Sequence, residues 1–336
     1  MGRNGRATAG DVAAAAGVSR TTVGYVLNDT PHQKISESTR ARVLEAARRL
    51  EYAPSVAARM LKGIPSKVIV MLLPDWPLSQ VANGIVQAMS LRLGHLGYTL
   101  VSHTRGPESP PISQMWETLT PAAVLVLGDP DAETEASLRS SGFGFVIIMN
   151  TANSAGDSLG RRPQELEPGW LQAEHLLSRG HSRFGYAGTD DQRLTSMSSD
   201  RLSGVRLFCA DYDLPPPIHQ VVPLDIDDAA KAVRAWRSAS PPVTAVCAFN
   251  DEVALSVLAG MRQEGLTAPD DLAVIGVDDI PTARLAAPPL TSVAFPIERL
   301  SEYFVSAVME TVGHPSESSI PVPEAAEPIV IVRRST

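Results

Sequence analysis

The segment Gly17–Asn28, with the sequence GVSRTTVGYVLN, constrains the fold of this chain more than any other. Gly17 can take the positive φ that a tight turn between two helices needs. Ser19 is a favourable N-cap for the helix that follows. The apolar spacing then predicts one buried stripe, formed by Val23, Val26 and Leu27. The segment therefore predicts the turn and second helix of a helix-turn-helix.

Polar side chains at the start of this second helix lie off the buried stripe, among them Arg20, Thr21 and Tyr25. In a helix-turn-helix the N-terminal end of the second helix enters the major groove of DNA. The segment thus indicates DNA binding, and the alternative is a small helical hairpin with a solvated face.

The distribution of charge favours DNA binding. Residues 1–63 contain ten Lys or Arg and five Asp or Glu, a net charge of +5, whereas the whole chain carries −8. A basic N-terminal module on an acidic body is suited to a polyanionic partner.

Three more helices are predicted around this segment. Thr8 and Asp11 form a capping box with Asp in place of Glu, which starts a helix that runs to about residue 16. Ser36 caps a helix that runs to about residue 50. Ser55 caps a short helix over 56–61, which cannot be stable alone in water and must fold against something.

Together these segments resemble the headpiece and hinge of the LacI/GalR (lactose-repressor) family of bacterial transcription regulators. The matching pieces are Thr8, DVA at 11–13, AGVS at 16–19, TV at 22–23, VLN at 26–28, Ser36 with Thr39 and Arg40, and YAPSVAARMLKG at 52–63. The resemblance implies that Arg20 and Thr21 read bases. It also implies that the hinge helices of two subunits pair in the minor groove, where Leu61 is wedged into the central base step. The implied DNA contacts are Thr8, Ser19, Arg20, Thr21, Thr22, Tyr25, Asn28, Ala58, Leu61 and Lys62.

Two positions in the reading helix depart from the family pattern. Gly24 and Tyr25 stand where the family usually has Ser and Arg, and Tyr25 cannot make the bidentate contact of an arginine with guanine. Gly24 also costs helix stability, roughly 1 kcal/mol relative to Ala. We therefore expect base preferences that differ from those of the family.

From Lys67 onward, short apolar runs alternate with helical stretches. Buried parallel strands are predicted over 68–73, 99–101, 124–127, 145–149, 184–187, 221–222, 245–249 and 272–277, and a last strand over 329–332. Helices are predicted over 79–96, 132–140, 170–179, 198–210, 228–238 and 251–263. Two such series predict two doubly wound parallel-sheet lobes, which bind ligands at the carboxyl ends of their strands.

The body also resembles the family, as in the segments LLSRGHSRFGYAG and GLTAPDDLAVIGVDDIP. The resemblance implies an α/β body like that of the periplasmic binding proteins, behind an all-α helix-turn-helix headpiece. The expected domains are a headpiece over 1–54, a hinge over 55–65 and a two-lobed effector-binding and dimerisation domain over 66–336. Lobe 1 is expected over about 66–165 and 295–324, and lobe 2 over about 166–294 and 325–336.

By the family pattern, Arg201, Asn250 and Asp278 of lobe 2 face a small-molecule effector, since guanidinium and carboxylate groups can hold its polar atoms. The alternatives are a loop salt bridge for Arg201 and Asp278 and a plain helix N-cap for Asn250. Further candidates at strand ends of lobe 1 are Trp76, His103 and Asn150, with a core role as the alternative for Trp76. Asn150, where the family often has Asp, and the unusual segment 151–169 predict an effector unlike those of well-known members, with a sugar or sugar derivative expected first.

Other classes of protein find little support in the sequence. It has no nucleotide-binding loop and no hydrolase elbow, so we expect no enzyme and no cofactor. The seven histidines and two cysteines have no metal-ligand spacing. No apolar run would span a membrane and no secretory signal is evident, so a cytoplasmic location is expected.

The sequence therefore predicts a transcriptional regulator, a repressor, that binds a pseudo-palindromic operator as a homodimer under the control of an effector. A dimer is expected because the apolar C-terminal heptad helix of tetrameric relatives is not found in this sequence. The alternative is a solute-binding protein of the periplasmic sugar-binding type without regulatory DNA binding, which the body alone would fit.

Overall fold

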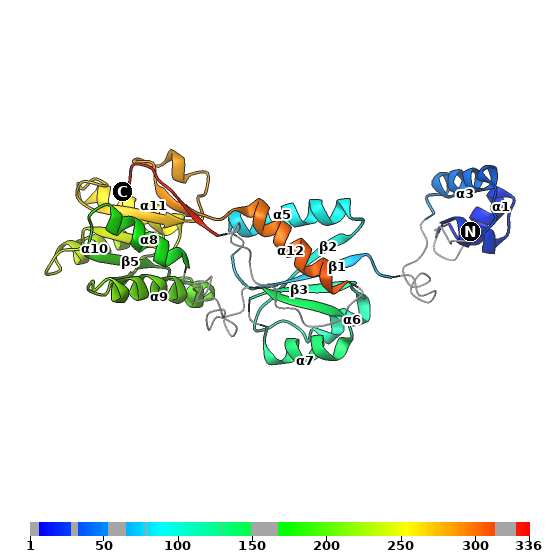
Figure 1. Cartoon of the computed structure of the whole chain (residues 1–336), viewed down its shortest axis with the longest axis horizontal. Helices are drawn as coiled ribbons and strands as arrows, with labels where there is room; N and C mark the ends of the chain where they lie inside the picture. Colours follow the sequence, from blue (N-terminus) through cyan, green and yellow to red (C-terminus); the bar gives the residue numbers. More distant parts are fainter. Residues whose placement is uncertain are drawn as a thin grey trace. The chain divides into compact units, whose positions relative to one another are not determined.

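The computed structural model describes residues 7–27, 33–52, 65–77, 79–128, 130–148, 167–312 and 327–336. The chain divides into two compact units, Met1–Ser66 and Lys67–Thr336, each described here by itself (Figure 1). No helix among the described residues is long and apolar enough to cross a membrane.

The first unit contains the predicted helices α1 (Ala9–Ala16), α2 (Arg20–Leu27) and α3 (Glu37–Arg49). The capping box is formed as predicted, with the Asp11 amide donating to the Thr8 hydroxyl and the Thr8 amide donating to the Asp11 carboxylate. Gly17 ends α1 with a φ of +66°, which gives the chain its turn into α2. The predicted hinge helix over 56–61 lies outside the described residues.

Apolar side chains of all three helices form one small core. The stripe predicted for α2 supplies Val23 and Val26, with Leu27 packed at its edge. The buried members are Val12, Ala13, Ala16, Val23, Val26, Val43, Ala46 and Ala47. This packing fixes α2 against α1 and α3, because isolated helices of this length are marginal in water.

The second unit begins with a parallel sheet whose strand order is β2-β1-β3-β4. Its strands are β1 (Val68–Pro74), β2 (Thr99–Arg105), β3 (Ala123–Leu127) and β4 (Gly144–Ile148). Helices α5 (Gln80–His95) and α12 (Ile297–Thr311) cover one face, where Ile69 and Met71 are buried. Helices α6 (Ser113–Thr118) and α7 (Ala132–Ser141) cover the other, where Val70 and Leu72 are buried. We call this sheet with its four helices the first lobe (Figure 1).

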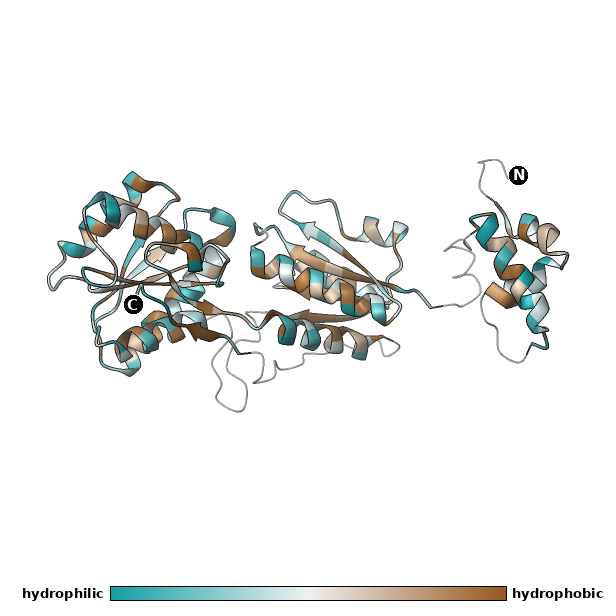
Figure 2. Ribbon diagram, turned by 90° about the horizontal axis from the view of Figure 1, so that it is seen from above, coloured by the Kyte–Doolittle hydropathy of each residue, from teal (hydrophilic) through white to brown (hydrophobic). Residues whose placement is uncertain are grey.

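The remaining strands form a sheet in the order β10-β9-β8-β7-β5-β6. They are β5 (Phe184–Gly188), β6 (Ile218–Val221), β7 (Ala245–Ala248), β8 (Ala273–Val277), β9 (Thr291–Ala294) and β10 (Ile329–Ile331). The accompanying helices are α8 (Glu167–Ser178), α9 (Thr195–Asp211), α10 (Ile226–Arg237) and α11 (Asp251–Gln263), with 3₁₀ turns at Gln192–Leu194 and Ala283–Leu285. We call this the second lobe. Its strands β5, β7 and β8 are buried along their whole length, and the helices around them carry hydrophilic as well as hydrophobic residues (Figure 2).

The two predicted parallel-sheet series are confirmed, with several local corrections. The strand predicted over 221–222 is wrong in position, since β6 covers Ile218–Val221. β10 pairs antiparallel to β9, so the second sheet is mixed at one edge. Three elements were not predicted, namely β9, α6 and α12. β9 is only four residues long and begins with Thr and Ser, and α6 has no fully buried side chain. β2 runs to Arg105, which places His103 inside the strand and not at its end.

The chain changes lobes after β9. α12 packs on α5 and on β3 and β4 of the first lobe, and β10 then pairs with β9 in the second. The core of the first lobe therefore includes side chains of α12, which lie more than 150 positions after the end of β4 in the chain. They are Leu300, Tyr303, Phe304, Val305, Ala307 and Val308.

Candidate DNA-reading helix and effector site

The N-terminal turn of α2 presents polar side chains on a capped helix. Arg20 and Thr21 are exposed. The Ser19 hydroxyl accepts a hydrogen bond from the Thr22 amide at 3.1 Å and shares another with the Thr22 hydroxyl at 2.9 Å. Ser19 and Thr22 therefore hold the helix start, while Arg20 and Thr21 are the side chains available to a ligand.

The other predicted DNA contacts differ in their surroundings. Thr8 is exposed, and its hydroxyl donates to the Asp11 carboxylate at 2.7 Å. Tyr25 is half-buried. Asn28, Ala58, Leu61 and Lys62 lie outside the described residues.

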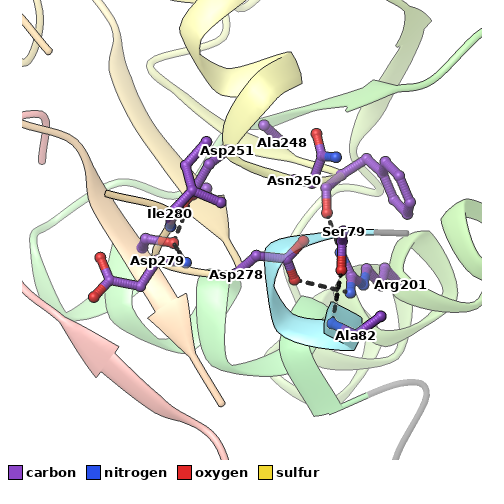
Figure 3. A network of polar contacts seen from close by, with 12 residues as sticks. Ser79, Ala82, Arg201, Ala248, Asn250, Asp251, Asp278, Asp279 and Ile280 are labelled. Atoms are coloured by element: carbon purple, nitrogen blue, oxygen red, sulfur yellow. Dashed lines mark hydrogen bonds and ion pairs between the residues drawn. The ribbon is translucent and has the colours of Figure 1, made fainter. Parts of the chain in front are cut away.

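In the second lobe the structure brings Arg201 and Asp278 together, as Figure 3 shows. The Arg201 side chain is 8% exposed and the Asp278 side chain 10%, with 3.5 Å between the guanidinium Nη2 and the carboxylate Oδ1. Nη1 of Arg201 also donates to the carbonyl oxygen of Phe249 at 2.5 Å, and the guanidinium lies 4.8 Å from the centre of the Phe249 ring. The pair thus sits where β7 and β8 end.

Burial acts against the charge of Asp278. It raises the pKa of this carboxyl above its ordinary value, although the Arg201 cation and its hydrogen bond pull in the opposite direction. A buried ion pair has to be satisfied by further polar partners to be stable. The pair can therefore hold a polar ligand that offers both donors and acceptors.

Asp278 is held in an unusual backbone conformation. Its φ is +103° and that of Asp279 is +46°, both in the region that non-glycine residues rarely adopt. The hydroxyl of Ser292 on β9 accepts from the Asp279 amide at 3.0 Å and donates to Asp251 at 2.6 Å. Asp251 in turn accepts from the Ile280 amide at 2.8 Å. These bonds over-determine the turn and so aim Asp278 toward Arg201.

Asp251 and Ser292 are functional candidates that sequence reasoning missed. Asp251 is fully buried at the start of α11, and burial raises its pKa to about 7. A carboxylate that directly follows a strand and a capping Asn is a signal that could have identified it, because strand ends form the ligand-facing edge of such sheets. A serine within a short strand carries no comparable signal.

For the remaining predicted effector-site residues, the structure shows other roles or positions than contact with the Arg201 and Asp278 pair. The Asn250 side-chain oxygen accepts from the Val253 amide at 2.9 Å, so it caps α11 as the alternative interpretation held. Trp76 follows β1 and lies over Gly128 after β3, with a ring carbon 3.5 Å from where a Cβ on Gly128 would be. β1 and β3 flank the point where the strand order reverses. His103 is in mid-strand on β2, and Asn150 lies outside the described residues.

The described residues contain no group of three or more His, Cys, Asp or Glu side chains that could hold a metal ion. Polar recognition is what the Arg201 and Asp278 pair offers.

Two family models match this chain. The model of the bacterial regulatory proteins of the lacI family matches residues 8–55, and that of the periplasmic binding protein-like domain matches residues 173–336. The chain belongs to the LacI family.

Similar LacI-family proteins match it over nearly the whole length. It is 27% identical to the HTH-type transcriptional repressor PurR of Mannheimia succiniciproducens, covering 92% of each chain. It is 29% identical to that of Vibrio parahaemolyticus, covering 91% of this chain and 92% of the relative.

Solved LacI-family structures show the same fold. The Lac repressor dimer bound to operator and the anti-inducer ONPF has a TM-score of 0.78 at 20% identity and covers 98% of this chain and 99% of its own. The complex of the transcriptional regulator CelR with cellobiose has a TM-score of 0.62 at 24% identity and covers 98% of this chain and all of its own.

This LacI-family member is a DNA-binding transcriptional regulator with an α/β body, and the solute-binding alternative is not supported. The family consists of transcriptional regulators and not of enzymes.

Proposed function

We propose that this regulator binds a pseudo-palindromic operator as a homodimer and represses transcription, with Arg20 and Thr21 reading bases in the major groove. The observation that carries the proposal is the exposed first turn of α2, which the Ser19 cap and the α1–α3 core hold rigidly. Binding groups are most effective when the scaffold fixes them before contact. A repressor of this kind acts in the cytoplasm.

The proposal assigns residues 1–54 to the headpiece, 55–65 to the hinge and 66–336 to the effector-binding and dimerisation domain. In it, Leu61 and Ala58 of paired hinge helices enter the minor groove, and Leu61 opens the central base step. Effector binding changes the spacing of the two hinges and thereby the affinity for DNA.

The effector is a small polar molecule that binds Arg201 and Asp278, with Asn250 and Trp76 at the edge. The sequence favours a sugar or sugar derivative, and the similarity to the CelR–cellobiose complex supports this class of effector. The relatives named PurR favour a purine-type compound instead. Isothermal titration of the full chain with cellobiose, and separately with hypoxanthine, distinguishes the two classes. If a binding heat is measured with hypoxanthine and none with cellobiose, the effector class in this proposal changes from a sugar to a purine.

Selection of operators from a random duplex pool tests DNA reading directly. Arg20→Ala should bind the selected operator with a free energy weaker by about 1–3 kcal/mol and should relax one position, because a bidentate base contact is lost. Leu61→Ala should weaken all operators that share the central step. If both variants bind as tightly as the parent, the assignment of reading helix and hinge is wrong.

A further inference from the structure

The guanidinium of Arg20 lies on the backbone of Gly10 at the start of α1. A Cβ atom placed on Gly10 would be 2.8 Å from Nη2, 3.0 Å from Nε and 3.2 Å from Cζ of Arg20. Separations this short are not tolerated between a methyl group and a guanidinium, so a side chain at this position would displace Arg20.

We propose that Gly10 is a specificity-determining residue. Because Gly10 has no side chain, the Arg20 guanidinium can lie against its backbone, and we call this position of the guanidinium the Gly10 seat. The seat fixes which base pair Arg20 reads. This inference rests on the proposed base contact of Arg20. Gly10 lies on α1, outside the reading helix. In this proposal it affects base recognition without contacting a base itself.

The charges around the seat fit the guanidinium. The start of a helix carries a partial positive charge that repels a cation. Asp11, one residue after Gly10, places a carboxylate at the same helix end. Hydrogen bonds from the Thr8 side chain and backbone lower the pKa of Asp11, and the Arg20 cation adds to this lowering. The Asp11 carboxylate thus offsets the repulsion from the helix end.

Seating matters for recognition because a free arginine side chain loses much rotamer freedom when it binds. A guanidinium already held against α1 loses less, so its contact contributes more to affinity. It also reaches the groove from one fixed point, so it meets one base pair and not its neighbours.

Substitution of Gly10 separates this role from a structural one. An alanine there would displace only the far end of a flexible side chain, not backbone. Alanine is also the better helix former, so α1 should not be weakened. Gly10→Ala should therefore change DNA recognition while the protein remains folded.

The test uses the full chain and an operator selected from random duplex DNA by the parent protein. Fluorescence anisotropy at one fixed salt concentration gives the Kd of the parent, Gly10→Ala, Arg20→Ala and the double variant, since affinity depends strongly on salt. Ala15→Ser, at an exposed position of the same helix, is the matched control.

We expect Arg20→Ala to raise the Kd about tenfold and Gly10→Ala to raise it at least about threefold, with discrimination lost at the same operator position. In the Arg20→Ala background, Gly10→Ala should change nothing, because the seat has no occupant. Ala15→Ser should bind as the parent does, and the Tm of Gly10→Ala should be no lower than that of the parent.

Three outcomes overturn the inference in distinguishable ways. If Arg20→Ala is weakened but Gly10→Ala binds as the parent does, the seat is refuted and base reading by Arg20 stands. If Gly10→Ala is weakened equally in both backgrounds, it acts through something other than Arg20. If Arg20→Ala itself binds with parental affinity and specificity, the proposed base contact fails and the seat with it.

Discussion

The carboxyl group of Asp251 is enclosed by β8, β9 and the turn that carries Asp278. A Cβ on Gly276 of β8 would lie 2.0 Å from its Oδ1, so glycine at that position is required for the carboxylate to fit. Burial is the main reason that the pKa of Asp251 rises to about 7, from 3.8 for the ordinary side chain. The folded protein therefore binds this proton more tightly than the unfolded chain does.

This difference predicts a pH dependence of stability. The contribution of Asp251 is fully present below about pH 4 and is lost as the pH rises to about 7, by at most about 1.4 kcal/mol per pH unit. Asp251→Asn should therefore show a flatter free energy of unfolding between about pH 4 and pH 7, measured by urea denaturation.

Asp271→Asn is the matched control for that measurement. Its backbone hydrogen bond with Thr267 lowers the pKa of Asp271, so its titration falls below this pH window. An Asp251→Asn protein with the same slope as the parent would refute the role given to burial of this carboxyl.

The pairing of Arg201 with Asp278 gives a second prediction for single residues. Arg201→Ala leaves the Asp278 carboxylate buried without its cation, which should lower the free energy of unfolding by about 3–5 kcal/mol. Arg201→Ala combined with Asp278→Ala should cost clearly less than the two single changes added together, in urea denaturation at one pH. Additive costs would show that the two groups do not interact.

The pairing could be anticipated from the sequence only in part. Arg201 and Asp278 were predicted from the family resemblance, and the βαβ pattern predicted a strand that ends directly before Asp278. The positive φ of Asp278 and the bonds from Asp251 and Ser292 could not be anticipated, because the bonds join residues that lie 13 to 41 positions apart in the chain.

At the scale of elements, helices α8 and α9 meet at Gly169. A Cβ there would lie 1.9 Å from the backbone oxygen of Arg201, so the two helices can pack this closely only through glycine. The same contact sets the position from which Arg201 extends. Gly169 therefore couples helix packing to the proposed effector site.

Gly169→Ala should force backbone apart and lower the free energy of unfolding by about 1–3 kcal/mol in urea denaturation. Gly94→Ala in α5 is a suitable comparison, because a Cβ on Gly94 has no neighbour within 4 Å and should not destabilise the helix. Equal stability of the Gly169→Ala protein and the parent would argue against close packing at this site.

Helices and strands were predictable where a whole segment repeats one pattern. The continuous apolar run of β1, which is buried from Ile69 to Leu73, is a local property, and so are the capping box of α1 and the Ser36 cap of α3; all three were found. β9 was not predicted because Thr291 and Ser292, two of its four residues, carry buried hydroxyl groups whose partners, Thr336 and Asp251, lie in distant segments.

For the whole molecule, the relevant quantity is the number of subunits on DNA. Two reading helices must occupy half-sites about one helical turn or a multiple apart, so one chain is insufficient. We expect sedimentation velocity at micromolar concentration with operator DNA to show a dimer. A monomer or a stable tetramer under those conditions would contradict this prediction.

The position of α12 in the chain has a consequence for synthesis. The strands of the first lobe leave the ribosome long before α12, because translation proceeds from the N-terminus. Until residues 297–311 emerge, the sheet face that α12 covers stays open to water or to chaperones. Ribosome-bound chains that end near residue 294 should therefore remain protease-sensitive in the first lobe, whereas chains long enough to expose α12 should be protected there.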